Sequence, residues 1–366
     1  MGWAAIIPCL RPPPGRHLYG STTLGHNGRG MEDRIAAFLK SRLAAGEVSV
    51  SNVYRIPGGA SRETWAFDAQ WREDGKEIRQ GFILRRDPDA SVLETDRDLE
   101  FRVMDAVQAH GIPVPRMFWL EQDTSWLDRP FFVMERVDGC ETSPSKVVMD
   151  PRFYVVRDRI GERFVDILAA IHRLEWRALG LDFLGPPANE DSCGMVEIEK
   201  WEAIVDREAL EPQPVLRAAF RWLRRRLPPP AQRIVLVHAD YRTGNFLCDP
   251  QGQIVGVLDW EMAHLGDPME DIAWACLRPW RWMGDEQVGG LLRREEFYEK
   301  YSAASGLRVD EEAVRFWEVL GNVKLAAIFL TGGRSFCEGR TRAPMMALLG
   351  RNVGRLELEV MDLMGV

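Results

Sequence analysis

The sequence predicts an α+β fold, in which a first part with antiparallel strands and a helix precedes a larger, mainly helical part. Three early segments alternate apolar and polar residues and are separated by turn residues, as strands of one sheet are: 48–55, 63–70 and 77–84. Later, apolar residues recur with helical spacing, as in 157–174, and hairpins within 235–261 interrupt the helices. A chain of 366 residues is long enough to form two lobes.

The first 30 residues differ in composition from the rest of the chain. They contain four prolines, several glycines and three arginines, but no acidic residue. We expect them to be a disordered tail, or to result from a start assigned too early, with Met31 as the natural beginning. After Met31, apolar residues at helical spacing predict an opening helix: Ile35, Phe38, Leu39 and Leu43.

We expect the boundary between the lobes after residue 135, so that 31–135 form the first lobe and 136–366 form the second. The glycine-containing break at 57–61 separates two strands of the first lobe. A helix with acidic residues near its start is expected over 93–110. Two further strands are expected within 111–123 and 130–139.

Three polar residues interrupt apolar, strand-like runs in 235–261. Asp240 and Asn245 lie in a loop after the first run, and Asp259 ends the run 254–258. The order strand, loop, strand, turn and strand places all three groups at one end of a small hairpin. Phosphoryl transfer requires a carboxylate that accepts a hydroxyl proton, and an amide and a carboxylate that bind Mg²⁺. The constellation therefore predicts a phosphoryl-transfer site.

This segment resembles the aminoglycoside phosphotransferase and choline kinase family, whose members are relatives of the protein kinases. The motif H-x-D-x-x-x-x-N runs from His238 to Asn245, and a strand ending in L-D-W-E follows at 258–261. A downstream G-D-P and Asp271 match the same family. The resemblance implies a two-lobed, protein-kinase-like fold. It also implies Mg²⁺-dependent transfer of the γ-phosphoryl group of ATP, or of GTP, to a hydroxyl of a small molecule.

The resemblance assigns roles within the catalytic segment. Asp240 would orient the acceptor hydroxyl and take its proton, while Asn245 and Asp259 would bind Mg²⁺. Glu261, two residues after Asp259 and on the same face of an extended chain, would contact metal or solvent. Two residues are expected to brace the loop through hydrogen bonds: His238 and Asp271.

The resemblance also implies nucleotide-binding residues. Gly59 and Ser61 lie in the turn that would approach the β-phosphate. The third strand carries Arg85 and Arg86 where the family has lysine; motif alignment favours Arg85, and the choice between them stays open. Glu100 would pair with this cation from the helix. The purine is expected to meet three hinge residues, namely the side chain of Met134 and the backbone of Glu135 and Val137.

Composition excludes several classes of protein. A net charge of −8 and a pI of about 5.5 argue against a general nucleic-acid binder. No apolar stretch reaches the roughly 18–20 residues of a membrane span. The six cysteines are scattered without zinc spacing and indicate thiols in a reducing cytosol, so a cytoplasmic location is expected. The sequence leaves the oligomeric state open.

The acceptor is harder to predict than the reaction. Aminoglycosides are polycations and require clustered carboxylates, whereas the C-terminal segment carries arginines such as Arg334 and Arg340. Trp280 would add apolar or stacking surface to the same site. The L-R-R third strand and L-D-W-E resemble kinase domains associated with acyl-CoA dehydrogenases. A hydroxyacyl-CoA or similar metabolite is therefore favoured over an aminoglycoside.

Two other classes of protein stay open. The missing third-strand lysine allows a nucleotide-binding pseudokinase, against which the complete set of Asp240, Asn245 and Asp259 argues. A metal-dependent hydrolase would need further histidine ligands, but no other histidine stands at ligand spacing from His238. His172 is expected to be a packed histidine of a helix rather than a functional group.

Overall fold

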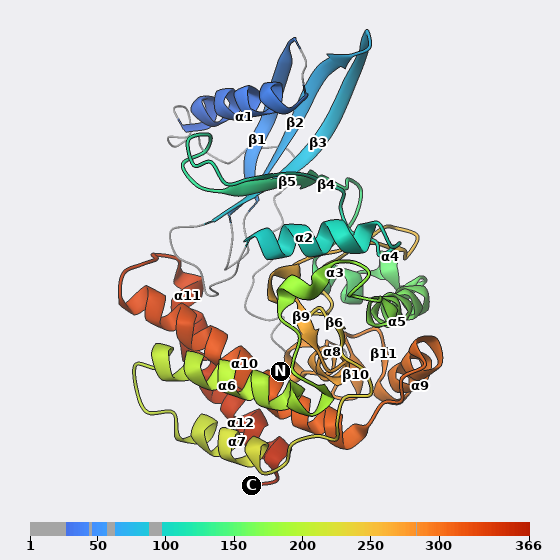
Figure 1. Cartoon of the computed structure of the whole chain (residues 1–366), viewed down its shortest axis with the longest axis vertical. Coiled ribbons are helices and arrows are strands. Elements are labelled where there is room, and N and C mark those ends of the chain that lie inside the picture. Colours follow the sequence, from blue (N-terminus) through green and yellow to red (C-terminus); the bar gives the residue numbers. More distant parts are fainter. Residues whose placement is uncertain (1–26, 44–45, 57–62, 88–96, 283) are drawn as a thin grey trace. The chain divides into compact units, whose positions relative to one another are not determined.

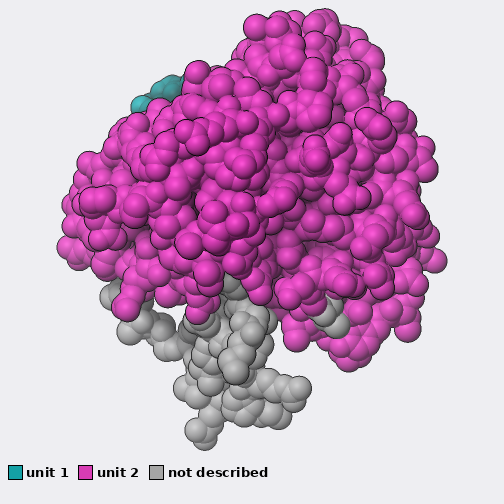
Figure 2. Space-filling model, turned by 90° about the horizontal axis from the view of Figure 1, so that it is seen from below, with its two compact units in different colours: residues 1–88, 116–138 teal, residues 89–115, 139–366 magenta. Residues whose placement is uncertain are grey.

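The computed structural model describes residues 27–43, 46–56, 63–87, 97–282 and 284–366 (Figure 1). Contacts divide the chain into two units, of which the first comprises 1–88 and 116–138 and the second comprises 89–115 and 139–366 (Figure 2). The expected division into the continuous lobes 31–135 and 136–366 differs from these units in two respects, since the first unit runs to residue 138 and residues 89–115 belong to the second unit. Helix α2 (Arg97–Gln108) groups with the second unit, because it packs against the short 3₁₀ helices η2 (Leu181–Leu184) and η4 (Trp260–Met262).

The first unit is an antiparallel sheet with one helix. Its elements are α1 (Asn27–Leu43), β1 (Val48–Ile56), β2 (Glu63–Glu73), β3 (Lys76–Arg86), β4 (Met117–Glu121) and β5 (Phe131–Glu135). The strands follow the order β1-β2-β3-β5-β4, and each neighbouring pair is antiparallel. The helix begins at Asn27, somewhat before the expected start at Met31. The antiparallel sheet predicted for this part of the chain is confirmed.

Aromatic packing joins α1 to the sheet. Ile35, Phe38 and Leu39 recur at helical spacing and enter one buried cluster with residues of β2, β3 and β5. The ring of Phe38 meets the ring of Phe131 edge-on at 4.9 Å, a favourable arrangement for aromatic pairs. Phe82 of β3 lies in the same cluster. One face of the sheet is therefore covered by the helix.

The second unit is mainly helical. Its longer helices are α5 (Arg157–Arg173), α6 (Cys193–Glu208), α7 (Pro214–Arg224), α8 (Met269–Ala275), α9 (Arg294–Ser305), α10 (Glu311–Cys337), α11 (Pro344–Arg351) and α12 (Val353–Met364). Shorter ones are α3 (Pro144–Met149), α4 (Pro151–Tyr154), η3 (Glu190–Ser192) and η5 (Arg278–Trp280). No helix among these described residues combines the length and apolarity needed to cross a bilayer.

Helix α10 is the centre of the second unit and packs against α6, α7, α8, α11 and α12. The side chain of Asp310 accepts hydrogen bonds from the backbone of Glu312 and Ala313 and so caps its first turn. Helices α10 and α11 can approach closely because glycines face each other, since a Cβ added at Gly333 of α10 would lie 2.9 Å from the Cα of Gly350 of α11. Helix α10 is buried along most of its length, so it forms the core of the second unit.

Three two-stranded sheets lie among the helices: β6 (Val235–Val237) with β9 (His264–Gly266), β7 (Phe246–Cys248) with β8 (Ile254–Val257), and β10 (Gln287–Val288) with β11 (Leu292–Arg293). The expectation that Asp240, Asn245 and Asp259 share one hairpin is wrong. Asn245 and Asp259 flank the β7–β8 hairpin, but Asp240 follows β6, whose partner is β9. The candidate site is therefore assembled from two sheets.

Candidate active site

The carboxylate of Asp240 is held by three hydrogen-bond donors. The indole nitrogen of Trp274 donates to Oδ1 at 2.7 Å, and Nε of Arg242 donates to the same oxygen at 2.9 Å. Nδ2 of Asn245 donates to Oδ2 at 2.5 Å. Donors on both oxygens fix the direction in which the carboxylate points. Because the side chain keeps 15% of its surface exposed, the carboxylate can still be reached by a ligand.

Asn245 and Asp259 are suited to bind a cation together. The amide nitrogen of Asn245 faces Asp240, which leaves the amide oxygen as the atom available to a metal. The backbone N–H of Leu258 donates to the carbonyl of Asn245 at 2.8 Å, so that Asp259 follows directly beside it. An amide oxygen and a carboxylate are hard ligands that match Mg²⁺. The donor set therefore fits the metal that the sequence predicted.

Unusual backbone conformations occur beside these groups. Ala239 has a φ of 67° and Asp259 a φ of 62°, both in the left-handed region that residues with a Cβ rarely adopt. Such strain persists only where surrounding contacts hold it, and it occurs often at functional sites. Gly244 has a φ of 113°, and a Cβ there would lie 3.0 Å from Pro144. The loop between Asp240 and Asn245 therefore depends on glycine.

His238 connects the two sheets that carry the candidate groups. Its Nδ1 accepts the backbone N–H of Asp240 at 3.2 Å, and its Nε2 donates to the carbonyl of Leu258 at 3.0 Å. This pattern is that of a neutral imidazole, and burial lowers the pKa of His238 below its ordinary value. The contacts support the bracing role expected for this residue.

Asp271 of α8 holds the catalytic loop from behind and is fully buried. Its Oδ2 accepts the backbone N–H of His238 at 2.7 Å, and its Oδ1 accepts that of Ala239 at 2.8 Å. Nε2 of His172 donates to Oδ2 at 3.2 Å, while the hydroxyl of Tyr301 lies 2.6 Å from Nδ1 of the same imidazole. Burial alone would raise the pKa of Asp271, but the bonds from His172 and His238 lower it. His172 is packed, as expected.

Glu261 does not share a face with Asp259 in an extended chain, so that expectation is wrong. The chain turns into the 3₁₀ helix η4 directly after Asp259. The ring of Trp260, fully buried, packs 4.5 Å from the ring of His238 and occupies the space behind the turn. Glu261 is itself buried.

The expected nucleotide-binding residues belong to both units. Gly59 and Ser61 lie outside the described residues. Arg86 of β3 bonds to Glu63 at 2.7 Å and to the carbonyl of Leu127 at 3.0 Å within the first unit. Arg85 lies on the opposite face of the strand and is buried. The remaining expected residues are Glu100, fully buried in α2, Met134, buried in β5, and Glu135 and Val137, both partly buried.

The expected acceptor residues differ in their surroundings. Trp280 lies near the carboxylate of Asp240, because the guanidinium of Arg242 sits 4.5 Å from the ring centre of Trp280 while bonding to Asp240. Arg334 and Arg340 instead bond to Glu338, at 2.7 and 2.9 Å. These ion pairs account for both arginines without a ligand.

Sequence reasoning missed three residues of the site: Arg242, Trp274 and Lys324. Arg242 and Trp274 both donate to Asp240, and the ammonium of Lys324 donates to the carbonyl of Ala239 at 2.8 Å. A signal existed for Lys324, since it is a lone lysine within an otherwise apolar stretch of helix. For Trp274 the signal was helical spacing, because this residue follows Asp271 by three positions and therefore lies near the same face of the helix.

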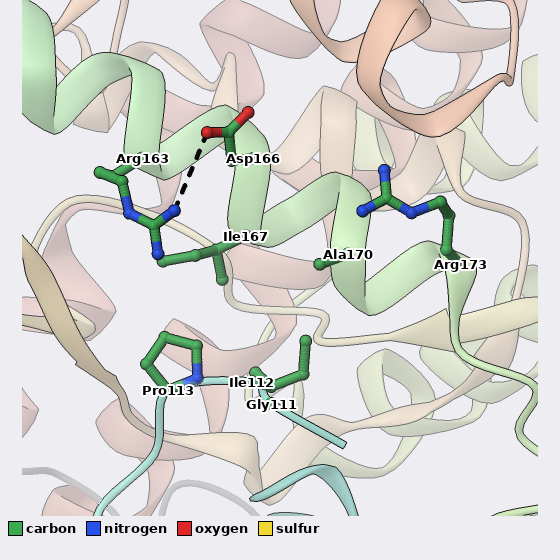
Figure 3. A pocket seen from close by; sticks show the side chains of 8 residues that line it. All are labelled: Gly111, Ile112, Pro113, Arg163, Asp166, Ile167, Ala170 and Arg173. Atoms are coloured by element: carbon green, nitrogen blue, oxygen red, sulfur yellow. Dashed lines mark ion pairs between the residues drawn. The ribbon is translucent and has the colours of Figure 1, made fainter.

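A separate hollow of about 320 Å³ lies beside α5 and the segment that follows α2 (Figure 3). In the close-up, Arg163, Asp166 and Arg173 project from α5 around it, with Arg163 and Asp166 joined at 3.9 Å. None of the predicted site residues lines it. The candidate chemistry is therefore concentrated at the Asp240 loop and not at this hollow.

The fold and the arrangement of Asp240, Asn245 and Asp259 define a class of protein, the phosphotransferases with a protein-kinase-like fold. The phosphotransferase enzyme family matches residues 53–317, and the chain belongs to this family. It is thus an enzyme of the small-molecule kinase class, as the sequence predicted.

The chain is also similar to parts of several curated proteins. Acyl-CoA dehydrogenase family member 10 of Mus musculus is 27% identical over 75% of this chain and 26% of its own length. Acyl-CoA dehydrogenase family member 11 of Pongo abelii is 28% identical over 74% of this chain and 36% of its own length. The chain thus spans about a quarter to a third of the curated relatives it matches.

The solved structures show the fold. A protein of Ralstonia eutropha assigned to the aminoglycoside phosphotransferases has a TM-score of 0.70 at 23% identity and covers 91% of this chain and 98% of its own. The choline kinase LicA of Streptococcus pneumoniae has a TM-score of 0.58 at 16% identity, covering 90% and 99%. An aminoglycoside phosphotransferase solved with ADP and hygromycin B has a TM-score of 0.55 at 14% identity, covering 90% and 97%.

Proposed function

We propose that the protein transfers the γ-phosphoryl group of ATP, or of GTP, to a hydroxyl of a small molecule in a Mg²⁺-dependent reaction. The observation that carries the proposal is the carboxylate of Asp240, which three donors hold in place while part of its surface stays exposed. A phosphoryl acceptor needs orientation more than it needs a strong base, because its proton leaves late in a loose transition state. A carboxylate that is firmly held in one direction meets that requirement.

The metal would be held by Asn245 and Asp259, through the amide oxygen and the carboxylate. Bound Mg²⁺ supplies charge neutralisation on the nucleotide phosphates. His238 links the loop of Asp240 to Leu258, next to Asp259, and so fixes the distance between acceptor and metal groups. A pseudokinase would not need Asp240, Asn245 and Asp259 together, so a pseudokinase is the second candidate for the function.

In the first unit, motif alignment favours Arg85 as the residue that would contact the phosphates. Arg86 is already bonded to Glu63 and Leu127, which explains its place in the strand without a nucleotide. Arg85 would supply a permanent charge, and Glu100 would orient it. The hinge residues Met134, Glu135 and Val137 would receive the purine, and Gly59 and Ser61 would approach the β-phosphate.

For the acceptor we propose a partly apolar, anionic alcohol, of which a hydroxyacyl-CoA is the leading example. The groups near Asp240 include the guanidinium of Arg242 and the ring of Trp280 that it contacts. The ring offers an apolar surface, and the guanidinium, although paired with Asp240, suits an anion better than a polycation. The names of the curated relatives, acyl-CoA dehydrogenase family members, support the same substrate class. Arg334 and Arg340 are weaker evidence for an anionic acceptor, because both are already paired with Glu338.

A screen of phosphoryl transfer from ATP and GTP tests the proposal. Hydroxyacyl-CoA compounds, aminoglycosides and choline would be offered with Mg²⁺, and the phosphorylated product would be detected by mass spectrometry. We expect a product with hydroxyacyl-CoA that disappears in Asp240→Asn, while nucleotide binding is retained. Transfer to aminoglycosides alone would contradict the substrate class, and nucleotide binding without turnover would favour the pseudokinase.

A further inference from the structure

A cluster of charged side chains lies behind the catalytic loop, where α6, β9, α8 and α10 meet. Its two carboxylates and Lys324 are buried, whereas Lys200 is 43% exposed. Its members, here called the charge cluster, are Glu197, Lys200, His264, Glu270 and Lys324. Lys200 bonds to Glu197 at 3.0 Å, and Nε2 of His264 lies 3.0 Å from Glu270. Lys324 bonds to Glu270 at 3.2 Å. Two carboxylates therefore meet two ammonium groups and one imidazole.

The charge cluster has the composition of an ion-pair network rather than of a metal centre. Glu197, His264 and Glu270 are close enough to bind one cation. However, Lys200 and Lys324 already neutralise both carboxylates. His264 also places Nδ1 3.0 Å from the carbonyl of Met262, so that both ring nitrogens face acceptors. That is the pattern of an imidazolium, and the two carboxylates raise the pKa of His264 although burial opposes its charge.

Lys324 is the member that reaches the catalytic loop. Its side chain is 3% exposed, and its ammonium donates to the carbonyl of Ala239 at 2.8 Å as well as to Glu270. The same ammonium lies 4.6 Å from the ring centre of Trp274, within range of a cation–π interaction. Burial of a charge this deep costs free energy unless its partners compensate it. Two of the groups that contact the ammonium, Ala239 and Trp274, adjoin Asp240.

The contact with Ala239 matters because that residue is strained. Ala239 has a φ of 67°, and both of its backbone polar groups are bound by charged side chains. Its N–H donates to Asp271 at 2.8 Å, and its carbonyl accepts from Lys324 at 2.8 Å. The peptide carbonyl of Ala239 directly precedes the nitrogen of Asp240. Lys324 thus fixes the peptide plane from which the carboxylate of Asp240 projects, and its contact with Trp274 fixes one donor to that carboxylate.

We propose that Lys324, held by Glu270, is a positioning residue for phosphoryl transfer. It acts through Ala239 and Trp274 and sets the direction of the Asp240 carboxylate. The inference rests on the proposed function, because positioning is defined here by the transfer that Asp240 serves. Lys200 provides a control for the loss of an ammonium from the charge cluster, since it bonds to Glu197 and not to Ala239, although it is 43% exposed.

The test compares Lys324→Met with Lys200→Met in the full chain. Hydrogen–deuterium exchange would follow the amides of His238, Ala239 and Asp240, each of which donates to a side chain of the site. We expect these amides to exchange at least about tenfold faster in Lys324→Met and at the wild-type rate in Lys200→Met. With an active acceptor, kcat should fall about a hundredfold in Lys324→Met while the KM for nucleotide stays constant, since a displacement of about 1 Å has that effect.

Glu270→Gln is the second variant, in case Lys324→Met does not fold. It keeps the shape of the side chain but removes the charge that holds Lys324, and we expect faster exchange at the same three amides. Unchanged exchange in both variants, or an equal effect of Lys200→Met, would overturn the proposal. So would one equivalent of zinc in the purified protein, because the charge cluster would then be a metal centre. A wild-type protein without any transfer activity would refute the proposed function, whereas the exchange experiment still reports whether Lys324 holds the loop.

Discussion

Replacing Asp271 by Asn tests how the catalytic loop is held. Three N–H donors point at its two carboxylate oxygens, from His238, His172 and Ala239. An amide offers a single acceptor oxygen, so its NH₂ group must face at least one of these donors. The least costly orientation keeps the bonds to His238 and His172 and leaves the N–H of Ala239 without an acceptor.

That N–H would be buried without a partner, which costs about 1–3 kcal/mol, and the other two bonds would weaken as the charge is lost. We therefore expect a loss of about 3 kcal/mol in the free energy of unfolding, a large fraction of the total of about 5–15 kcal/mol. Because Ala239 adjoins Asp240, kcat should also fall, by about a hundredfold.

Urea unfolding and steady-state kinetics would measure both effects. Asp166→Asn is the matched control, because Asp166 is 57% exposed and its ion pair with Arg163 is long at 3.9 Å. This control should change the free energy of unfolding by less than about 0.5 kcal/mol. If Asp271→Asn lowered the free energy of unfolding no more than Asp166→Asn does, the carboxylate of Asp271 would not be the group that holds the loop.

Three further predictions concern single side chains. Trp274→Phe keeps the aromatic ring but removes the N–H that bonds to Asp240, so kcat should fall about tenfold with little change in thermal stability; an unchanged kcat would contradict this. His264 has a raised pKa, so its stabilising charge is fully present below about pH 6.5 and is lost as the pH rises through the folded-state value. The wild type should therefore melt at a higher temperature than His264→Gln at low pH, and this difference should shrink as the pH rises above about 6.5. A difference in melting temperature that does not change with pH would refute the reasoning. Phe38→Ala opens a cavity between α1 and the sheet and should cost about 3–5 kcal/mol in urea unfolding, whereas a loss below about 1 kcal/mol would mean that the helix is not part of that core.

Local sequence patterns predicted the elements of the fold well. Alternation predicted the strands that form β1, β2 and β3. The motif around Asp240 led to the family, which the match over residues 53–317 confirms. Patterns of this kind depend on neighbours in sequence, and they succeed where structure is decided locally.

Contacts between distant segments could not be predicted in the same way. The pairing of β6 with β9, instead of with the β7–β8 hairpin, is a choice among several short apolar strands that have no distinguishing residues. The left-handed backbone conformation of Asp259 could not be predicted either, because no sequence pattern marks an aspartate that adopts it. Lys324 reaches Ala239 across 85 positions of the chain, and only the packed helix α10 brings them together.

The connection between the two small sheets has a consequence for how the enzyme would lose activity. The imidazole of His238 joins the end of β6 to the end of β8 through Asp240 and Leu258. Two-stranded sheets of three or four residues are too short to persist alone, so each depends on the surrounding helices. A partly unfolded second unit would therefore hold neither the carboxylate of Asp240 nor the side chains of Asn245 and Asp259 in position. Heat inactivation should follow the melting of this whole unit as a single event, with no active truncated form of it.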